Sequence, residues 1–302
     1  MKKIIIAGGT GFLGNACVEY FKSKYDSIIV LTRHMRTSKE NITYIPWDAK
    51  TLGSWQKYLN DCDVLINMTG RSVDCRYTDR NKKIIMNSRI DATKILGVAI
   101  SLCKNPPKIW FNSSTATIYR HSLEKQMSED NGDIGTGFSV GVAKAWEEAF
   151  FSQKTPHTRK IALRTSIVLG KNGGALTPLK NLAKIGFGGK QGTGNQKFSW
   201  IHVDDFTRSI DFIIQNKHLD GYINIVSPEP TTNNNLMKSV RKVVGISFGI
   251  PLSNFILKIG AAIIQTETEL ILKSRNVIAK KLLDAGFTFK YPFLEKALAE
   301  SI

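Results

Sequence analysis

The chain opens with Ile4-Ile5-Ile6-Ala7-Gly8-Gly9-Thr10-Gly11-Phe12-Leu13-Gly14, an apolar run followed by a glycine-rich turn. The β-branched run indicates a buried parallel strand, and residues 15–21 show the apolar spacing of a helix. Glycines let the backbone turn sharply and approach a diphosphate, whose charge is stabilised by free amides at the helix amino end. The stretch therefore predicts a dinucleotide-binding turn made by Gly8, Thr10, Gly11, Phe12, Leu13 and Gly14.

The next apolar run, residues 27–31, predicts a second strand, and the residues after it bear on the choice of dinucleotide. An NAD-preferring site usually carries an acidic residue here, which holds the adenosine ribose hydroxyls. This chain has Arg33, followed by Arg36 and Lys39, and a guanidinium suits the 2′-phosphate of NADP. Basic residues are abundant throughout the chain, which leaves an incidental arginine as the alternative. We expect NADP rather than NAD.

The composition is strongly basic. The 302 residues include 42 Lys and Arg against 25 Asp and Glu, a formal net charge of +17, and 42% are hydrophobic, enough to bury a full core. Such a surplus favours anionic ligands. The lysines are scattered, however, and no helix-turn-helix, zinc or RNA-reading signature accompanies them, so we expect no nucleic-acid partner.

Cysteine usage and hydropathy indicate the compartment. The four cysteines, at positions 17, 62, 75 and 103, show no paired spacing, which predicts thiols rather than disulfides or metal ligands. The first residues pass straight into a strand, with no signal or transit segment. The apolar run Phe255–Ile264 is too short to span a bilayer and contains Lys258. We therefore expect a cytoplasmic protein with no metal and no membrane partner.

Strand-like and helix-like segments alternate as far as residue 170. Further strands are expected at 42–46, 63–67, 108–111 and 161–164, and helices at 79–103 and 139–152. In the first of these helices the core candidates are Ile84, Ile85, Ile95, Leu96 and Val98. This alternation predicts an α/β fold, a doubly wound parallel sheet with helices on both faces.

Beyond residue 170 the pattern loosens into glycine-rich loops and short helices, where a substrate site usually lies. We therefore expect a Rossmann domain at 1–170 that binds NAD(P), its sheet completed by segments within 197–226. Residues 171–302 are expected to supply substrate-side loops and a small, mainly helical C-terminal lobe.

At this point the chain resembles an extended short-chain dehydrogenase/reductase, the superfamily of nucleotide-sugar epimerases and dehydratases. Four separated blocks carry the resemblance: Gly8-x-x-Gly11-x-x-Gly14, Asn67-Met68-Thr69-Gly70, the run from Ser113 to Tyr119, and the run from Phe198 to Asp205. More narrowly, it is similar to an atypical branch of epimerases of unassigned substrate. The blocks that support this are Asn87-Ser88-Arg89-Ile90, residues 144–148, 173–176 and 194–196, and a C-terminal module that ends at 281–287.

The resemblance implies roles for several residues. Asn67, Thr69 and Gly70 would let the cofactor lie flat against a strand end. Arg164, at the end of the sixth strand, would contact substrate or cofactor, and a buried salt bridge is the alternative. Thr115 would hydrogen-bond the substrate oxygen.

The resemblance also implies a catalytic tyrosine with a lysine four residues later. Lys144 fits the lysine, which would hold the nicotinamide ribose, but four residues earlier the chain has Val140. A valine neither donates nor accepts a proton. No tyrosine occurs between Tyr119 and Tyr222, so a shift of register does not restore the pair.

Two explanations remain open. Either Tyr119 or His202 supplies the proton, although each also has a structural interpretation, as pocket wall or as a loop-bonding histidine. Or the protein binds NADP without turnover. The neighbouring Asp204 and Asp205 are best interpreted as helix-capping residues.

We therefore expect an NADP-dependent oxidoreductase or epimerase that acts on a small carbonyl or sugar-nucleotide-like substrate and lacks the usual tyrosine. The alternative is a non-catalytic NADP-binding regulatory or interaction protein. The resemblance further implies a homodimer through the helix at 79–103 and the helix that bears Lys144.

Overall fold

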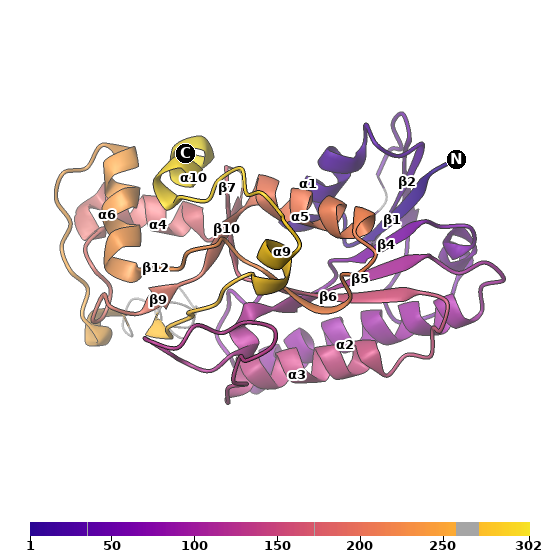
Figure 1. Ribbon diagram of the computed structural model, residues 1–302, viewed down its shortest axis with the longest axis horizontal. Helices are drawn as coiled ribbons and strands as arrows, with labels where there is room; N and C mark the ends of the chain where they lie inside the picture. Colours follow the sequence, from indigo (N-terminus) through magenta and orange to yellow (C-terminus); the bar gives the residue numbers. More distant parts are fainter. Residues whose placement is uncertain (35, 172, 258–271) are drawn as a thin grey trace.

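A seven-stranded parallel sheet forms the centre of the amino-terminal part of the molecule (Figure 1). Its strands lie in the order β11-β6-β5-β4-β1-β2-β3, and every neighbouring pair runs parallel. This computed structural model describes residues 1–34, 36–171, 173–257 and 272–302. The expected doubly wound α/β fold is confirmed.

The strands of the large sheet are β1 (Lys3–Ala7), β2 (Ser27–Thr32), β3 (Ile42–Pro46), β4 (Val64–Asn67), β5 (Ile109–Thr115), β6 (Arg159–Thr165) and β11 (Gly221–Ile225). The helices packed around it are α1 (Phe12–Phe21), α2 (Asp79–Ser101), α3 (Phe138–Phe151) and α5 (Val203–Gln215), with short turns η1 (Ser54–Leu59) and η2 (Ala116–Ile118). The remaining elements are β7 (Ile167–Gly170), β8 (Gly173–Gly174), α4 (Leu176–Leu182), η3 (Ala183–Phe187), β9 (Lys197–Phe198), β10 (Trp200–His202), β12 (Thr231–Thr232), α6 (Asn233–Val244), α9 (Lys280–Asp284) and α10 (Leu294–Ser301).

Helices cover both faces of the sheet, and β1 shows why. Its side chains alternate: Ile4 and Ile6 belong to the apolar core beneath α1 and α5, whereas Ile5 and Ala7 belong to the core beneath α2 and α3. Both sets are fully buried. The two helix pairs lie on opposite sides of the sheet in Figure 1.

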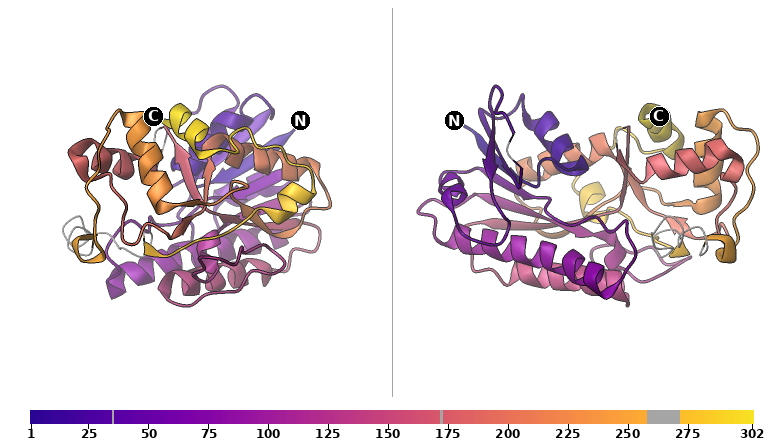
Figure 2. Two further views of the ribbon diagram at one scale, coloured as in Figure 1. Left: turned by 60° about the vertical axis from the view of Figure 1, so that its left-hand side comes forward. Right: turned by 180° about the vertical axis from the view of Figure 1, so that it is seen from behind.

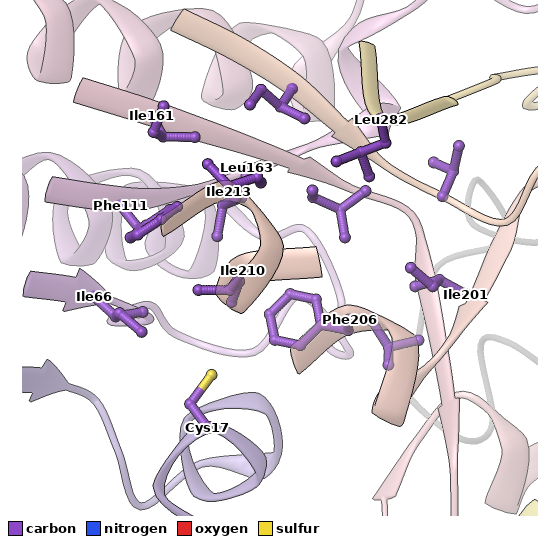
Figure 3. Packing of buried hydrophobic residues seen from close by; sticks show 14 of the residues in the cluster. Cys17, Ile66, Phe111, Ile161, Leu163, Ile201, Phe206, Ile210, Ile213 and Leu282 are labelled. Atoms are coloured by element: carbon purple, nitrogen blue, oxygen red, sulfur yellow. The ribbon is translucent and has the colours of Figure 1, made fainter. Parts of the chain in front are cut away.

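Helix α5 contributes the centre of one core (Figure 3). Phe206, Ile210 and Ile213 point from one stripe of the helix toward the sheet residues Phe111 and Leu163. All five side chains are fully buried, each burial worth about 1.5–3 kcal/mol. The chain reaches α5 only after it has passed through the region beyond residue 170.

That region, together with β7, forms two small sheets, in the orders β10-β7-β8 and β12-β9, and a separate apolar core. In this core, α6 packs against α10 through Leu236, Val240 and Leu298. Figure 2 shows from two further sides that α4, α6 and α10 lie together beyond one end of the large sheet.

Asp205 ties the C-terminal segment to the sheet domain. Its buried carboxylate accepts backbone hydrogen bonds of 2.8 Å from both Lys290 and Tyr291, and it pairs with Arg208 at 2.6 Å. The predicted helix-capping role does not account for these contacts of Asp205. The side chain that caps α5 is that of His202.

The core assignments in α2 are partly wrong. Ile85 and Leu96 are buried as expected, but Ile84 is 41% exposed and Val98 is 43% exposed. The buried stripe includes 85, 92, 96 and 99, and positions 84 and 98 lie one residue out of phase with it.

The four cysteines are all unpaired thiols. Burial raises the pKa of Cys17 and of Cys62 to about 12, so both are inert at neutral pH. No set of three His, Cys, Asp or Glu side chains within the described ranges could hold a metal ion.

The apolar run Phe255–Ile264 falls mostly on residues 258–271, which lie outside the described residues. Among the helices that the structure describes, none combines the length and the apolar character needed to cross a bilayer.

Candidate functional site

A cavity of about 520 Å³ lies beyond the carboxyl ends of β1, β4, β5 and β6. Open α/β sheets bind their ligands at this edge. Its wall is formed by the glycine turn after β1, the loop after β4, the ends of β5 and β6, and one face each of α2 and α3. The described lining residues are Gly8, Gly11, Phe12, Leu13, Gly14, Met68, Thr69, Gly70, Arg71, Ser72, Val73, Tyr77, Ile85, Arg89, Ser113, Ser114, Thr115, Thr117, Phe138, Ser139, Val142, Trp146, Thr165, Ser166 and Gly174.

The glycines of the first turn have different reasons to be glycine. Gly8 has φ +76°, which a side chain rarely tolerates. A Cβ on Gly14 would lie 2.3 Å from the carbonyl oxygen of Gly8, so the turn itself requires this glycine. A Cβ on Gly11 would meet only that same oxygen, at 3.7 Å, among the described residues. The space left free at Gly11 therefore belongs to the cavity.

The amino end of α1 faces the same space. Gly11 is its N-cap and offers no side chain, and the first turn carries no acidic residue. The first helical backbone bond runs from Asn15 N to Gly11 O, so the amides before Asn15 lack helical acceptors. These amides and the helix dipole make the turn suited to an anionic group such as a diphosphate.

Buried amides hold the loop after β4. Asn67 accepts a 3.0 Å hydrogen bond from the amide of Thr69 and donates one of 2.7 Å to Asn112 Oδ1. The Thr69 hydroxyl is buried beside the cavity and has no hydrogen-bond partner within the structure. An unpaired buried hydroxyl is costly, and a ligand oxygen or amide in the cavity would satisfy it. Together with the glycine cradle, this atom fits a bound dinucleotide.

Five of the twelve predicted cofactor residues do not line the cavity: Thr10, Arg33, Asn67, Lys144 and Arg164. Thr10 is half-buried on the turn, and Arg33 is exposed just after β2. The nearby Arg36 guanidinium lies over the Tyr44 ring, 6.0 Å from its centroid. Asn67 also does not line the cavity but shapes it through the loop.

Thr115 lines the cavity at the end of β5. Its hydroxyl oxygen accepts a 3.1 Å hydrogen bond from the amide of Thr117, which fixes its rotamer. The hydroxyl proton therefore remains available for a ligand oxygen.

Helix α3 presents a different face to the cavity from the one expected. Neither position of the expected catalytic pair faces the cavity. Lys144 is exposed to solvent, and Val140, 2% exposed, packs in the core. The α3 residues that line the cavity are instead Phe138, Ser139, Val142 and Trp146. A shift of two residues turns a helical position by about 200°, so Lys144 points away from the site.

Tyr119 and Arg164 also lie outside the cavity wall, in a buried polar cluster. The Tyr119 hydroxyl accepts a 3.0 Å hydrogen bond from Arg164 and donates one of 2.9 Å to Asn224. Arg164 forms a bidentate ion pair with Glu147. Burial raises the pKa of Tyr119. The structure thus places Arg164 in the salt bridge considered as its alternative role.

His202 is buried at the start of α5, also away from the cavity wall. Its Nδ1 accepts a 3.1 Å hydrogen bond from the amide of Asp204, and its ring lies 4.0 Å from that of Tyr291. Burial lowers its pKa, which keeps the imidazole neutral. This is the environment of a structural histidine.

Several lining side chains were not predicted as site residues, and two of them carry a charge or a phenol of interest. Arg89 of α2 donates hydrogen bonds to the carbonyl oxygens of Arg71, at 3.0 Å, and Ile85, at 2.9 Å, and its guanidinium lies 5.0 Å from the Trp146 ring. Burial lowers its pKa to about 10, so it is charged at neutral pH. The other is Tyr77, just before α2. Arg89 belongs to the block Asn87-Ser88-Arg89-Ile90, which supports the family resemblance but implied no role for the residue. Tyr77 belongs to no motif that could be recognised in the sequence.

Comparison with known proteins gives a consistent result. Residues 4–225 match the NAD dependent epimerase/dehydratase family, and residues 253–301 match a domain of unknown function, DUF1731. The chain is 32% identical over 303 residues to the epimerase family protein YfhF of Bacillus subtilis, covering 99% of this chain and 97% of that protein.

Two solved structures have the same fold along almost all of this chain. The human epimerase family protein SDR39U1, crystallised with NADPH, is 26% identical with a TM-score of 0.87, covering 99% of this chain and 98% of that one. A nucleoside-diphosphate sugar epimerase from Corynebacterium glutamicum is also 26% identical, with a TM-score of 0.79, covering 99% of this chain and 58% of that one.

Proposed function

The chain belongs to the NAD dependent epimerase/dehydratase family, and from this premise we propose that it binds NADP(H) in the cavity beside α1 and acts as an oxidoreductase or epimerase. The substrate would be a small carbonyl compound or a nucleotide-linked sugar. The crystal structure of human SDR39U1 with NADPH and the Corynebacterium nucleoside-diphosphate sugar epimerase support this choice of cofactor and substrate class.

The observation that carries the proposal is the open space at Gly11. No described atom of the chain would clash with a Cβ on Gly11. The free space beside this residue adjoins the amides at the start of α1 and the Thr69 hydroxyl, which has no hydrogen-bond partner among the described residues. A diphosphate in this position would be bound by the amides and the helix dipole together. Arg33, exposed at the end of the neighbouring strand, would contact the 2′-phosphate.

The chain's own groups define what chemistry the cavity supports. A bound reduced nicotinamide would supply hydride to a substrate carbon. Thr115 would donate a hydrogen bond to the substrate oxygen as negative charge develops on it. Arg89, buried and cationic, makes the electrostatic potential of the cavity favourable to that charge.

A second candidate function is cofactor binding without turnover, as in a regulatory protein. The specific observation in its favour is α3, whose cavity-lining residues include no tyrosine, histidine, lysine or carboxylate; they are Phe138, Ser139, Val142 and Trp146. Under this candidate NADPH would bind and change the protein's stability, but no carbonyl compound would be reduced.

The test is calorimetric titration of the purified protein with NADPH and with NADH, followed by incubation with NADPH and a panel of carbonyl compounds. We expect saturable heat with NADPH, weaker binding of NADH and loss of absorbance from the reduced nicotinamide. Absence of binding by both dinucleotides contradicts both candidate functions. Binding without consumption supports the second.

The cellular setting is also part of the proposal. Two buried thiols and two half-buried ones, none of them paired, suit the reducing cytoplasm. A homodimer through α2 and α3 stays a prediction. The exposed apolar side chains Ile84 and Val98 on α2, and Leu102 just after it, would be covered in such a dimer. Light scattering at micromolar concentration would detect it.

A further inference from the structure

The face that α3 turns to the cavity carries no tyrosine, histidine, lysine or carboxylic acid. Phe138 and Val142 are apolar, and the hydroxyl of Ser139 is an aliphatic alcohol, a much weaker acid than a phenol. The remaining cavity-facing side chain of the series, Trp146, donates its indole N–H to Thr93 at 3.1 Å, inside the protein. A reaction that creates an alkoxide in this cavity therefore needs its proton from another element.

Tyr77 is the tyrosine among the described residues that line the cavity. It stands in the loop before α2, and its ring packs edge-on against Phe138, with 4.8 Å between the ring centroids. The phenol thus lies beside the first turn of α3. Tyr77 lines the same cavity as Thr115.

The charge around Tyr77 favours transfer of its proton. Arg71 and Arg89 line the cavity, and no carboxylate occurs among the described lining residues. Arg89 lines the same cavity as Tyr77, and a negative charge on the phenol would favour the protonated guanidinium. Of the groups farther out, Lys82 lies 5.9 Å from the Phe138 ring and is paired with Asp79 at 3.8 Å, while Asp74 and Arg76 flank the loop with opposite charges.

We propose that Tyr77 is the general acid of this site, with Arg89 as the cation that stabilises its phenolate, so that a pair on the α2 side replaces the tyrosine and lysine absent from α3. This inference rests on the proposed NADPH-dependent function. The Tyr77 O–H bond breaks and an O–H bond forms on the substrate carbonyl oxygen, whose carbon receives hydride from a reduced nicotinamide. The carbonyl electron pair moves to that oxygen, an alcohol leaves, and water returns a proton to the phenolate. The reverse reaction uses the phenolate as base.

A chemical test needs neither substrate nor cofactor. N-acetylimidazole acetylates phenolates, and mass spectrometry reports the rate at each tyrosine of the full-length protein. Tyr58 is the matched control, a half-buried phenol outside the cavity wall, with Lys57 5.3 Å from its ring. We expect Tyr77 to react at least tenfold faster than Tyr58, and Arg89→Met to slow Tyr77 without changing Tyr58. Equal rates at the two tyrosines, or an Arg89→Met variant that leaves the Tyr77 rate unchanged, would overturn the proposal.

Turnover provides the second measurement. Tyr77→Phe should lower kcat for NADPH-dependent carbonyl reduction by a factor on the order of 10²–10⁴, the usual share of a general acid, and leave the Kd for NADPH unchanged. Adding Phe138→Tyr to that variant should restore part of kcat, because the two rings are neighbours. Full activity in Tyr77→Phe with normal NADPH binding would refute the role of Tyr77 and leave the proposed function standing. If the parent protein, without any substitution, does not bind NADPH, the proposed function itself is refuted.

Discussion

Arg164 and Glu147 form a buried bidentate ion pair, with the Nε–Oε1 and Nη2–Oε2 distances both 2.8 Å. Burial alone would lower the pKa of Arg164, but the hydrogen bonds and charge of Glu147 outweigh it and raise that pKa. Glu147 also accepts a 2.6 Å hydrogen bond from the hydroxyl of Ser114, a residue that lines the cavity. The pair thus connects α3 and β6 to the floor of the site.

Removing one partner of this pair should be strongly destabilising. Glu147→Ala leaves the Arg164 guanidinium buried without its anion, which costs about 3–5 kcal/mol in the free energy of unfolding. Urea denaturation followed by circular dichroism measures this. The matched control is Asp133→Asn, which removes an exposed partner of Arg120 and Lys125 and should change the free energy of unfolding far less. Similar losses in both variants would contradict this account of the cluster.

Two glycine substitutions separate binding from folding. Gly11→Ala places its Cβ in open cavity space. The free energy of unfolding should therefore fall by less than about 1 kcal/mol, while the affinity for NADPH drops tenfold or more. Gly14→Ala puts its Cβ 2.3 Å from the Gly8 carbonyl oxygen, so the fold itself should be destabilised. Calorimetric titration and thermal melts of the two variants decide. Unchanged NADPH affinity in Gly11→Ala would show that the diphosphate binds elsewhere.

Arg33 should set the preference for NADPH over NADH. Arg33→Asp removes a charge-assisted contact to the 2′-phosphate and should weaken NADPH binding by about 1–3 kcal/mol. NADH has no such phosphate, so its affinity should not fall. Identical NADPH titration curves for the variant and the parent would exclude Arg33 from the site.

His202 should make stability depend on pH. Burial lowers its folded-state pKa below the ordinary value of 6.5, so the unfolded chain binds the proton more readily. The stability that neutral His202 contributes to the folded state is fully present above pH 6.5. It is lost as the pH falls below that value toward the folded-state pKa. His202→Asn keeps a side-chain acceptor at the N-cap of α5 but cannot titrate. Thermal melts between pH 8 and pH 5 should show a smaller decrease for this variant, and parallel curves would contradict the assignment.

The fold was largely predictable because its strands are uniformly apolar and separated by helical patterns. The strand at Ile42–Pro46 has the expected bounds, and β5 extends beyond the expected end at Phe111 to Thr115. That extension is polar at Asn112 to Thr115, where the strand approaches the cavity. Apolar patterning therefore locates the strands well and misses the polar strand ends beside the cavity.

The site was harder to predict because it depends on helix phase and on loops. Lys144 was matched by residue type and spacing, yet the sheet fixes the rotation of α3 so that Val142 faces the cavity instead. Tyr77 lies in a loop whose path no periodic pattern encodes. Asp205 binds Lys290 and Tyr291, far along the chain, and local sequence favoured a helix-capping role.

The position of β11 at the sheet edge has a consequence during synthesis. Its partner β6 ends at Thr165, but β11 itself begins at Gly221, after the small sheet that contains β7, β8 and β10. A ribosome must therefore release more than fifty further residues before the last edge of the main sheet can be covered. Until β11 is available, β6 is an unpaired edge strand, whose free N–H and C=O groups are a template for pairing with other chains.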